Sequence, residues 1–176
     1  PHLHSLLWYF AVIAAAALFY RRILPARTAA LAALLFAIDE GHWFPAAWIA
    51  NRNALVAVLP ALLGLVAHIR WREDDWRPGL PLSLGGLALG LAGGEPALGV
   101  FAMLGCYQLL ADHGALSRKL RGLAPALCLG LVWAVIYKTL GYGAHSSGLY
   151  IDPASEPLSY LVAAAERAPM LIGAMT

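Results

Sequence analysis

Long uncharged stretches separated by short charged clusters dominate this chain. The first stretch, residues 3–20, stops at Arg21 and Arg22 and has about the length of one bilayer crossing. The stretches are apolar nearly all round, and none shows the polar alternation of a membrane barrel strand. The pattern therefore predicts an all-α fold, a polytopic transmembrane helical bundle of about six membrane helices plus the start of another. The expected spans are residues 3–20, 28–38, 53–69, 79–94, 96–111 and 121–138.

The second span, residues 28–38, is short for a crossing, which needs about 20 residues. It resembles a buried helix of a soluble protein or a re-entrant piece, but a snorkelling Arg27 would help it to span. If residues 28–38 are counted as a span, successive spans run in opposite directions across the membrane. Nine of the 12 Lys and Arg residues then fall on one side. That side is expected to be cytoplasmic, with residues 39–52 and 139–157 as outer loops.

The composition supports this interpretation. The chain is 61% hydrophobic and 12% charged, whereas soluble domains contain about 25% charged residues. The basic residues flank the spans and form no aromatic-interleaved face, so no nucleic-acid partner is expected. We expect one transmembrane domain over residues 1–176, an internal fragment of a longer protein. Its expected location is the bacterial inner (plasma) membrane, with membrane lipid as a partner and the acidic loops outward.

Small residues and cysteines add little chemistry. Gly86, Gly90 and Gly94 form a stripe that predicts close helix packing within the bundle in preference to a dimerisation face. Cys106 and Cys128 both lie inside expected spans, and the six histidines do not cluster. We therefore expect no disulfide framework and no cofactor, and no ligand spacing supports a divalent metal.

The first outer loop carries the densest set of functional groups. Asp39, Glu40 and His42 are the candidate catalytic residues, because a carboxylate facing a cavity can take a proton from a hydroxyl. Asn51 and Arg52 are candidate donor-binding residues, since a guanidinium pairs well with a phosphate. The alternative is an interfacial loop whose charges are only solvated and whose tryptophans lie at headgroup depth.

Glu95 lies between two expected spans and just before Pro96. Its carboxylate either caps a tight helical hairpin or faces the protein interior, with Arg52 and Lys138 as candidate partners from the same side. We include Glu95 and Lys138 among the donor-binding candidates.

The second outer loop contributes Tyr150 and Asp152. The tyrosine is able to stack on a sugar, and the aspartate precedes a proline turn. The alternative is a connector without function.

Three segments, in the right order, are similar to proteins of the glycosyltransferase C superfamily, in particular bacterial O-mannosyltransferase-like membrane proteins with tetratricopeptide repeats. Residues 35–55 resemble the pattern H-x-E-A-V-A-W-I-x-x-R-x-D-L-L, residues 91–98 resemble L-L-S-K-E-x-A, and residues 137–143 resemble Y-x-x-R-x-x-x-G-G. Four residues match the family's functional positions: His42, Trp48, Arg52 and Glu95. The chain departs from the pattern at Asp39, Phe44, Gly94 and Lys138, which indicates a divergent member.

The resemblance implies transfer of a sugar from a polyprenyl-phosphate carrier, with a carboxylate of the family's first outer loop as base. That loop would precede Pro1, unless Asp39 or Glu40 takes the role. Our leading hypothesis is an inverting glycosyltransferase in which Arg52 and Lys138 steady the departing phosphate. Two alternatives stay open: an ion- or proton-coupled transporter or flippase that uses Glu95, and a catalytically inactive structural membrane protein.

Overall fold

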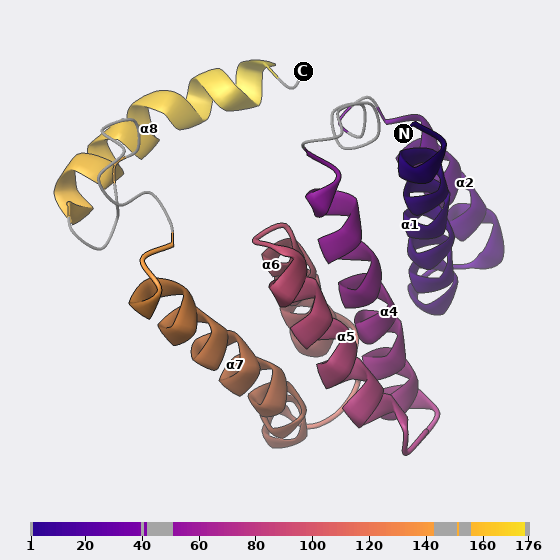
Figure 1. Cartoon of the computed structure of the whole chain (residues 1–176). Helices are drawn as coiled ribbons and strands as arrows, with labels where there is room; N and C mark the ends of the chain where they lie inside the picture. Colours follow the sequence, from indigo (N-terminus) through magenta and orange to yellow (C-terminus); the bar gives the residue numbers. More distant parts are fainter. Residues whose placement is uncertain (1, 40, 42–50, 143–150, 152–155, 175–176) are drawn as a thin grey trace. The chain divides into compact units, whose positions relative to one another are not determined.

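The computed structural model describes residues 2–39, 41, 51–142, 151 and 156–174 (Figure 1). Over these residues the regular elements are helices, and none is a strand, so the expected all-α fold is confirmed. In chain order they are α1 (His2–Ile23), α2 (Ala26–Ile38), α4 (Asn53–Glu73), α5 (Gly79–Gly93), α6 (Ala97–Cys106), the π-helical turn η3 (Tyr107–Ala111), α7 (Leu116–Thr139) and α8 (Pro157–Ala174).

The helices extend beyond the apolar stretches at their basic ends. The last turn of α1 contains Arg21 and Arg22, and the last turn of α4 contains Arg70 and Arg72. Cations near a helix C-terminus are stabilised by the partial negative charge of the free carbonyl groups. Charged residues that the sequence places outside the spans therefore belong to the helices themselves.

Three helices are long and apolar enough to cross a membrane: Leu3–Ile23, Asn53–Glu73 and Leu116–Thr139. The shorter apolar helices of the described part are Ala26–Ile38, Gly79–Gly93 and Ala97–Ala111. The chain is therefore compatible with an integral membrane protein, and by length and composition three of the six expected crossings meet the criterion for a full span.

The chain divides into two compact units, Pro1–Leu131 and Val132–Thr176. The second unit contains the end of α7 and the helix α8. Within it, the rings of Trp133 and Tyr137 lie 4.6 Å apart between centroids, and those of Tyr137 and Tyr142 lie 5.6 Å apart. These contacts join the last turns of α7 to the residues that follow it.

Helix α4 is the central element of the first unit, with α1, α5 and α6 packed against it (Figure 1). Its side chains Leu65 and Ile69 are fully buried, together with Leu87 of α5 and Leu104 of α6. Helix α2 packs on α1, where the Tyr9 hydroxyl donates a hydrogen bond to the Ala37 carbonyl oxygen at 2.7 Å. The first unit thus positions the start of α4 beside α1 and the end of α4 beside α6.

Glycines bring α4 and α5 into backbone contact. A Cβ added at Gly86 would lie 2.5 Å from the Pro60 carbonyl oxygen, and one at Gly90 would lie 2.8 Å from the Ala57 carbonyl oxygen. The expectation that these glycines pack within the bundle is therefore confirmed. Gly94 does not continue the stripe: its φ of 143° lies in a region that favours glycine, and it makes the turn from α5 to α6.

Candidate functional site

The predicted donor-binding residue Arg52 immediately precedes α4. It is partly buried, and its Nη1 lies 2.6 Å from Nδ1 of His4 on α1. Because a guanidinium is only a donor, Nδ1 of His4 accepts in this contact. The indole N–H of Trp8 lies 3.2 Å from Nε2 of the same ring.

Other predicted residues lie near the same end of the first unit. Asp39 follows α2, and its Oδ1 accepts a hydrogen bond from the Gly41 backbone N–H at 2.7 Å. Glu95 is exposed in the turn between α5 and α6. That turn lies beside the start of α4, since a Cβ on Gly94 would be 3.6 Å from Nδ2 of Asn53. Asn51, next to Arg52, is partly buried.

The remaining predicted site residues belong to the second unit or lie outside the described residues. Lys138 is exposed near the end of α7, in the second unit, so its pairing with Glu95 stays a prediction. Four further candidates, Glu40, His42, Tyr150 and Asp152, lie outside the described residues, as does Trp48. Their roles stay predictions.

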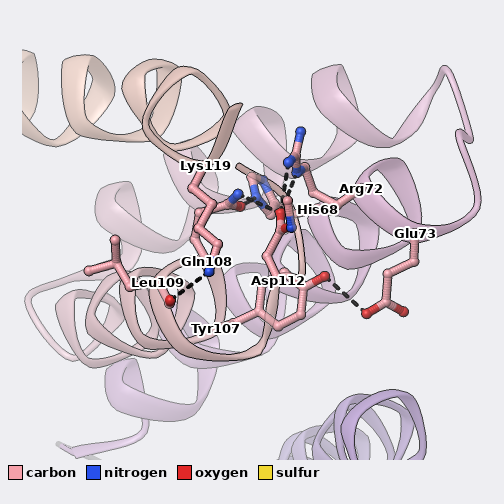
Figure 2. A network of polar contacts seen from close by, with 9 residues as sticks. His68, Arg72, Glu73, Tyr107, Gln108, Leu109, Asp112 and Lys119 are labelled. Carbon is pink, nitrogen blue, oxygen red and sulfur yellow. Dashed lines mark hydrogen bonds and ion pairs between the residues drawn. The ribbon is translucent and has the colours of Figure 1, made fainter. Parts of the chain in front are cut away.

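A second polar cluster, which the sequence analysis missed, lies at the opposite end of α4 (Figure 2). His68 and Arg72 are one turn apart on α4, and Gln108 and Asp112 are four residues apart in η3 and directly after it. The His68 and Gln108 side chains are fully buried. We call these four residues the inner cluster.

The inner cluster is a directed chain of hydrogen bonds. Arg72 donates to Oδ2 of Asp112 from Nε at 2.9 Å and from Nη2 at 2.7 Å, and the Gln108 side-chain amide donates to the same oxygen at 2.8 Å. The Gln108 carbonyl oxygen must then accept from Nε2 of His68, which lies 2.7 Å away. These roles assign a proton to Nε2 of His68.

The Asp112 carboxylate is charged in this setting. Burial raises its pKa, but the Gly114 backbone N–H, 2.6 Å from Oδ1, and the bonds from Arg72 stabilise the charged form, and nearby Arg118 adds a favourable charge. The net effect holds the pKa of Asp112 below its ordinary value. Arg72 and Asp112 therefore form a largely buried ion pair, with side chains 10% and 7% exposed.

The π-helical turn helps to build the inner cluster. In a π-helix the backbone hydrogen bond joins residues five apart. Here the Asp112 N–H donates to the Tyr107 carbonyl oxygen at 3.0 Å. At its edges the Tyr107 hydroxyl donates to Glu73 at 3.0 Å, and Lys119 of α7 donates to the Leu109 carbonyl oxygen at 2.8 Å (Figure 2). The cluster thus connects α4, η3 and the start of α7.

A sequence signal for the inner cluster does exist. His68 and Arg72 have the same four-residue spacing as Gln108 and Asp112, at the ends of two stretches assigned to the same side. Polar residues at this spacing share one helix face. The signal was missed because the two α4 residues were interpreted as flanking charges and Gln108 is a neutral residue inside an apolar run.

Within the described residues, no group of three or more His, Cys, Asp or Glu side chains is arranged to hold a metal ion. The groups that the structure describes at the Arg52 end are a guanidinium, an imidazole and carboxylates. At the inner cluster they are four side chains hydrogen-bonded to one another.

Comparison with models of protein families, with curated proteins and with solved structures gave no match to this chain.

Proposed function

We propose that the chain is the membrane part of a glycosyltransferase that takes a sugar from a polyprenyl-phosphate donor at the Arg52 end of α4. The observation that carries the proposal is the contact between Arg52 and His4. A partly buried guanidinium, held 2.6 Å from the His4 imidazole at the start of a long apolar helix, suits a lipid-linked phosphate.

Several features of Arg52 favour an anionic ligand. Its guanidinium has five N–H donors in a planar fork, and His4 occupies one nitrogen, so other donors remain for phosphate oxygens. The free N–H groups of the first turn of α4 add partial positive charge beside it. Asp39, at the end of α2, is the described carboxylate that we propose as the base for the acceptor hydroxyl.

The membrane arrangement belongs to the same proposal. We place six crossings in a bacterial inner membrane, with the Arg52 end and Glu95 outward. The excess of Lys and Arg at the other ends of the helices supports this orientation. The three helices of spanning length, together with the three shorter apolar helices, are consistent with it.

The test is transfer of radiolabelled hexose from a polyprenyl phosphate by the full-length protein in proteoliposomes. Arg52→Ala is expected to lower the rate about 100-fold, since it removes one preorganised donor to the leaving phosphate. Arg52→Lys should recover part of the activity, because it restores the charge without the fork. Arg121→Ala, at an exposed residue of α7, is the matched control and should have no effect. A normal rate in Arg52→Ala would refute the role of Arg52.

A proton-coupled transporter is the second candidate, and one observation favours it. His68 is buried inside a helix of spanning length and hydrogen-bonded to Gln108, whereas Glu95, the residue first considered for this role, is exposed. Ionisable groups inside membrane helices commonly mark proton pathways. Proton flux in the same proteoliposomes separates the candidates: a transporter loses flux in His68→Phe and keeps it in Arg52→Ala. An inactive structural protein would show neither activity.

A further inference from the structure

An apolar groove runs along the surface where α4 and α5 meet. It has a volume of about 530 Å³. Its walls include Pro60, Leu63 and Ala67 of α4 and Leu82 and Leu89 of α5, with Leu18 of α1 at its margin. In a membrane helix bundle such a space is open to lipid.

Gly85 gives the groove its depth. A Cβ on this exposed glycine would have no atom within 4 Å, whereas a Cβ on the next residue, Gly86, would collide with the backbone of α4. The two glycines therefore have different structural roles. Gly86 lets the helices touch, and Gly85 leaves space that a larger side chain would fill.

A cation closes one end of the groove. The Arg70 guanidinium stacks over the Trp76 ring at 4.0 Å, and both residues line the groove. The Arg70 Nε is buried and has no hydrogen-bond partner. Oδ2 of Asp74 forms an ion pair with this nitrogen at 3.7 Å, which is too far for a hydrogen bond, and it receives one at 2.9 Å from Arg22. Asp74 thus faces two arginines, and the three side chains together carry one net positive charge.

The length of the groove matches one leaflet of a bilayer. It extends from Pro60 to Arg70 on α4, which is about 15 Å at 1.5 Å per residue. The hydrocarbon core is about 30 Å thick, so half of it equals this length. The aromatic ring and the cation then lie at headgroup depth, where tryptophan and arginine are favoured.

We propose that this groove is a binding site for a phospholipid with an anionic headgroup, whose acyl chain lies between α4 and α5 and whose phosphate accepts hydrogen bonds from Arg70. The apolar walls, the one-leaflet length and a cation that shares its carboxylate partner with Arg22 fit this ligand. The site is at the opposite end of α4 from Arg52, so the proposal depends on the membrane placement of α4 and not on the transferase activity.

Native mass spectrometry of the full chain, released from nanodiscs of mixed phosphatidylglycerol and phosphatidylcholine, tests the site. The wild type is expected to retain one phosphatidylglycerol in preference to phosphatidylcholine. Arg70→Gln should lower that retention about tenfold, which corresponds to one charge-assisted hydrogen bond. Gly85→Leu should abolish retention of both lipids, because its side chain occupies the groove.

Two matched controls lie outside the groove. Arg77→Gln removes an exposed arginine of the same turn, and Gly99→Leu fills open space on α6, so both should retain lipid as the wild type does. Unfolding temperatures identify any variant that fails to fold. Equal retention of the two lipids by the wild type would overturn the proposal, and so would loss in the controls equal to that in Arg70→Gln and Gly85→Leu. A decrease in Gly85→Leu with none in Arg70→Gln would overturn the headgroup contact.

Discussion

The Arg72–Asp112 pair is the best-enclosed ionic contact among the described residues. Three donors converge on one oxygen of Asp112 and a backbone N–H satisfies the other. A buried pair of this kind contributes little compared with well-packed apolar residues, but removing one partner leaves the other charge buried without compensation. A substitution that removes only one of the two partners should therefore lower the stability of the protein.

We expect Asp112→Asn to lower the free energy of unfolding by about 3 kcal/mol, because Arg72 would remain buried and charged. Asp74→Asn is the control: the same change at an ion pair with side chains 34% and 41% exposed should cost less than about 1 kcal/mol. Denaturant unfolding in detergent micelles measures both. Equal effects of the two substitutions would show that the Arg72–Asp112 pair contributes no more than a surface pair.

The Arg72–Asp112 pair also makes the stability of the protein depend on pH. The pKa of Asp112 is lower in the folded protein than its ordinary value, so the stability from this group is fully present above about pH 4, the range of an unfolded aspartate. It is lost as the pH falls below that value through the folded pKa. Between pH 6 and pH 3 the wild type should therefore lose more stability than Asp112→Asn. Parallel pH curves would contradict this.

At the scale of single elements, the junction of α4 and α5 offers two adjacent glycines with opposite expected effects. Gly86→Ala should destabilise the protein by about 1–3 kcal/mol, because its Cβ would meet the Pro60 carbonyl and Gly64 within 3 Å and the helices must separate. Gly85→Ala should be neutral or stabilise by up to about 1 kcal/mol, since alanine favours helix and the space is open. Thermal unfolding in one detergent compares them. Similar shifts in both variants would argue against backbone contact at Gly86.

The helices were predictable because uncharged runs mark them directly: five of the six predicted ranges each overlap one helix, and 96–111 covers α6 together with η3. The ends of the helices were harder to predict. Arg70, Arg72 and Glu73 are charged residues typical of a loop, but they belong to α4. The π-helical turn has no signal in an apolar run such as 107–111. Arg52 was identified from its position before a span, but its partner His4 was not, because a contact across 48 residues depends on how α1 packs.

At the scale of the molecule, the proposed crossings fix the side on which each turn lies. In a variant without Cys106 and Cys128, Glu95→Cys should react with an impermeant maleimide added outside cells, and His113→Cys should react only after permeabilisation. The two residues flank the short apolar helix Ala97–Ala111, so opposite labelling means that it crosses the membrane. Labelling of both residues from the same side would show that Ala97–Ala111 does not cross the membrane, and the proposal of six crossings would be wrong. Arg77→Cys, expected inside, is the control.

The separation of the inner cluster along the chain has a consequence for biosynthesis. His68 and Arg72 each find their partner 40 residues later. At about 5–20 residues per second, ribosomes need roughly 2–8 s to add that length. On the proposed arrangement, α4 enters the membrane during this interval while His68 and Arg72 lack these partners. Arg72 lies one residue from the end of α4 and can reach the aqueous boundary, but His68 is a full turn deeper. On that arrangement, His68 and Arg72 gain their partners only when η3 and Asp112 have been synthesised.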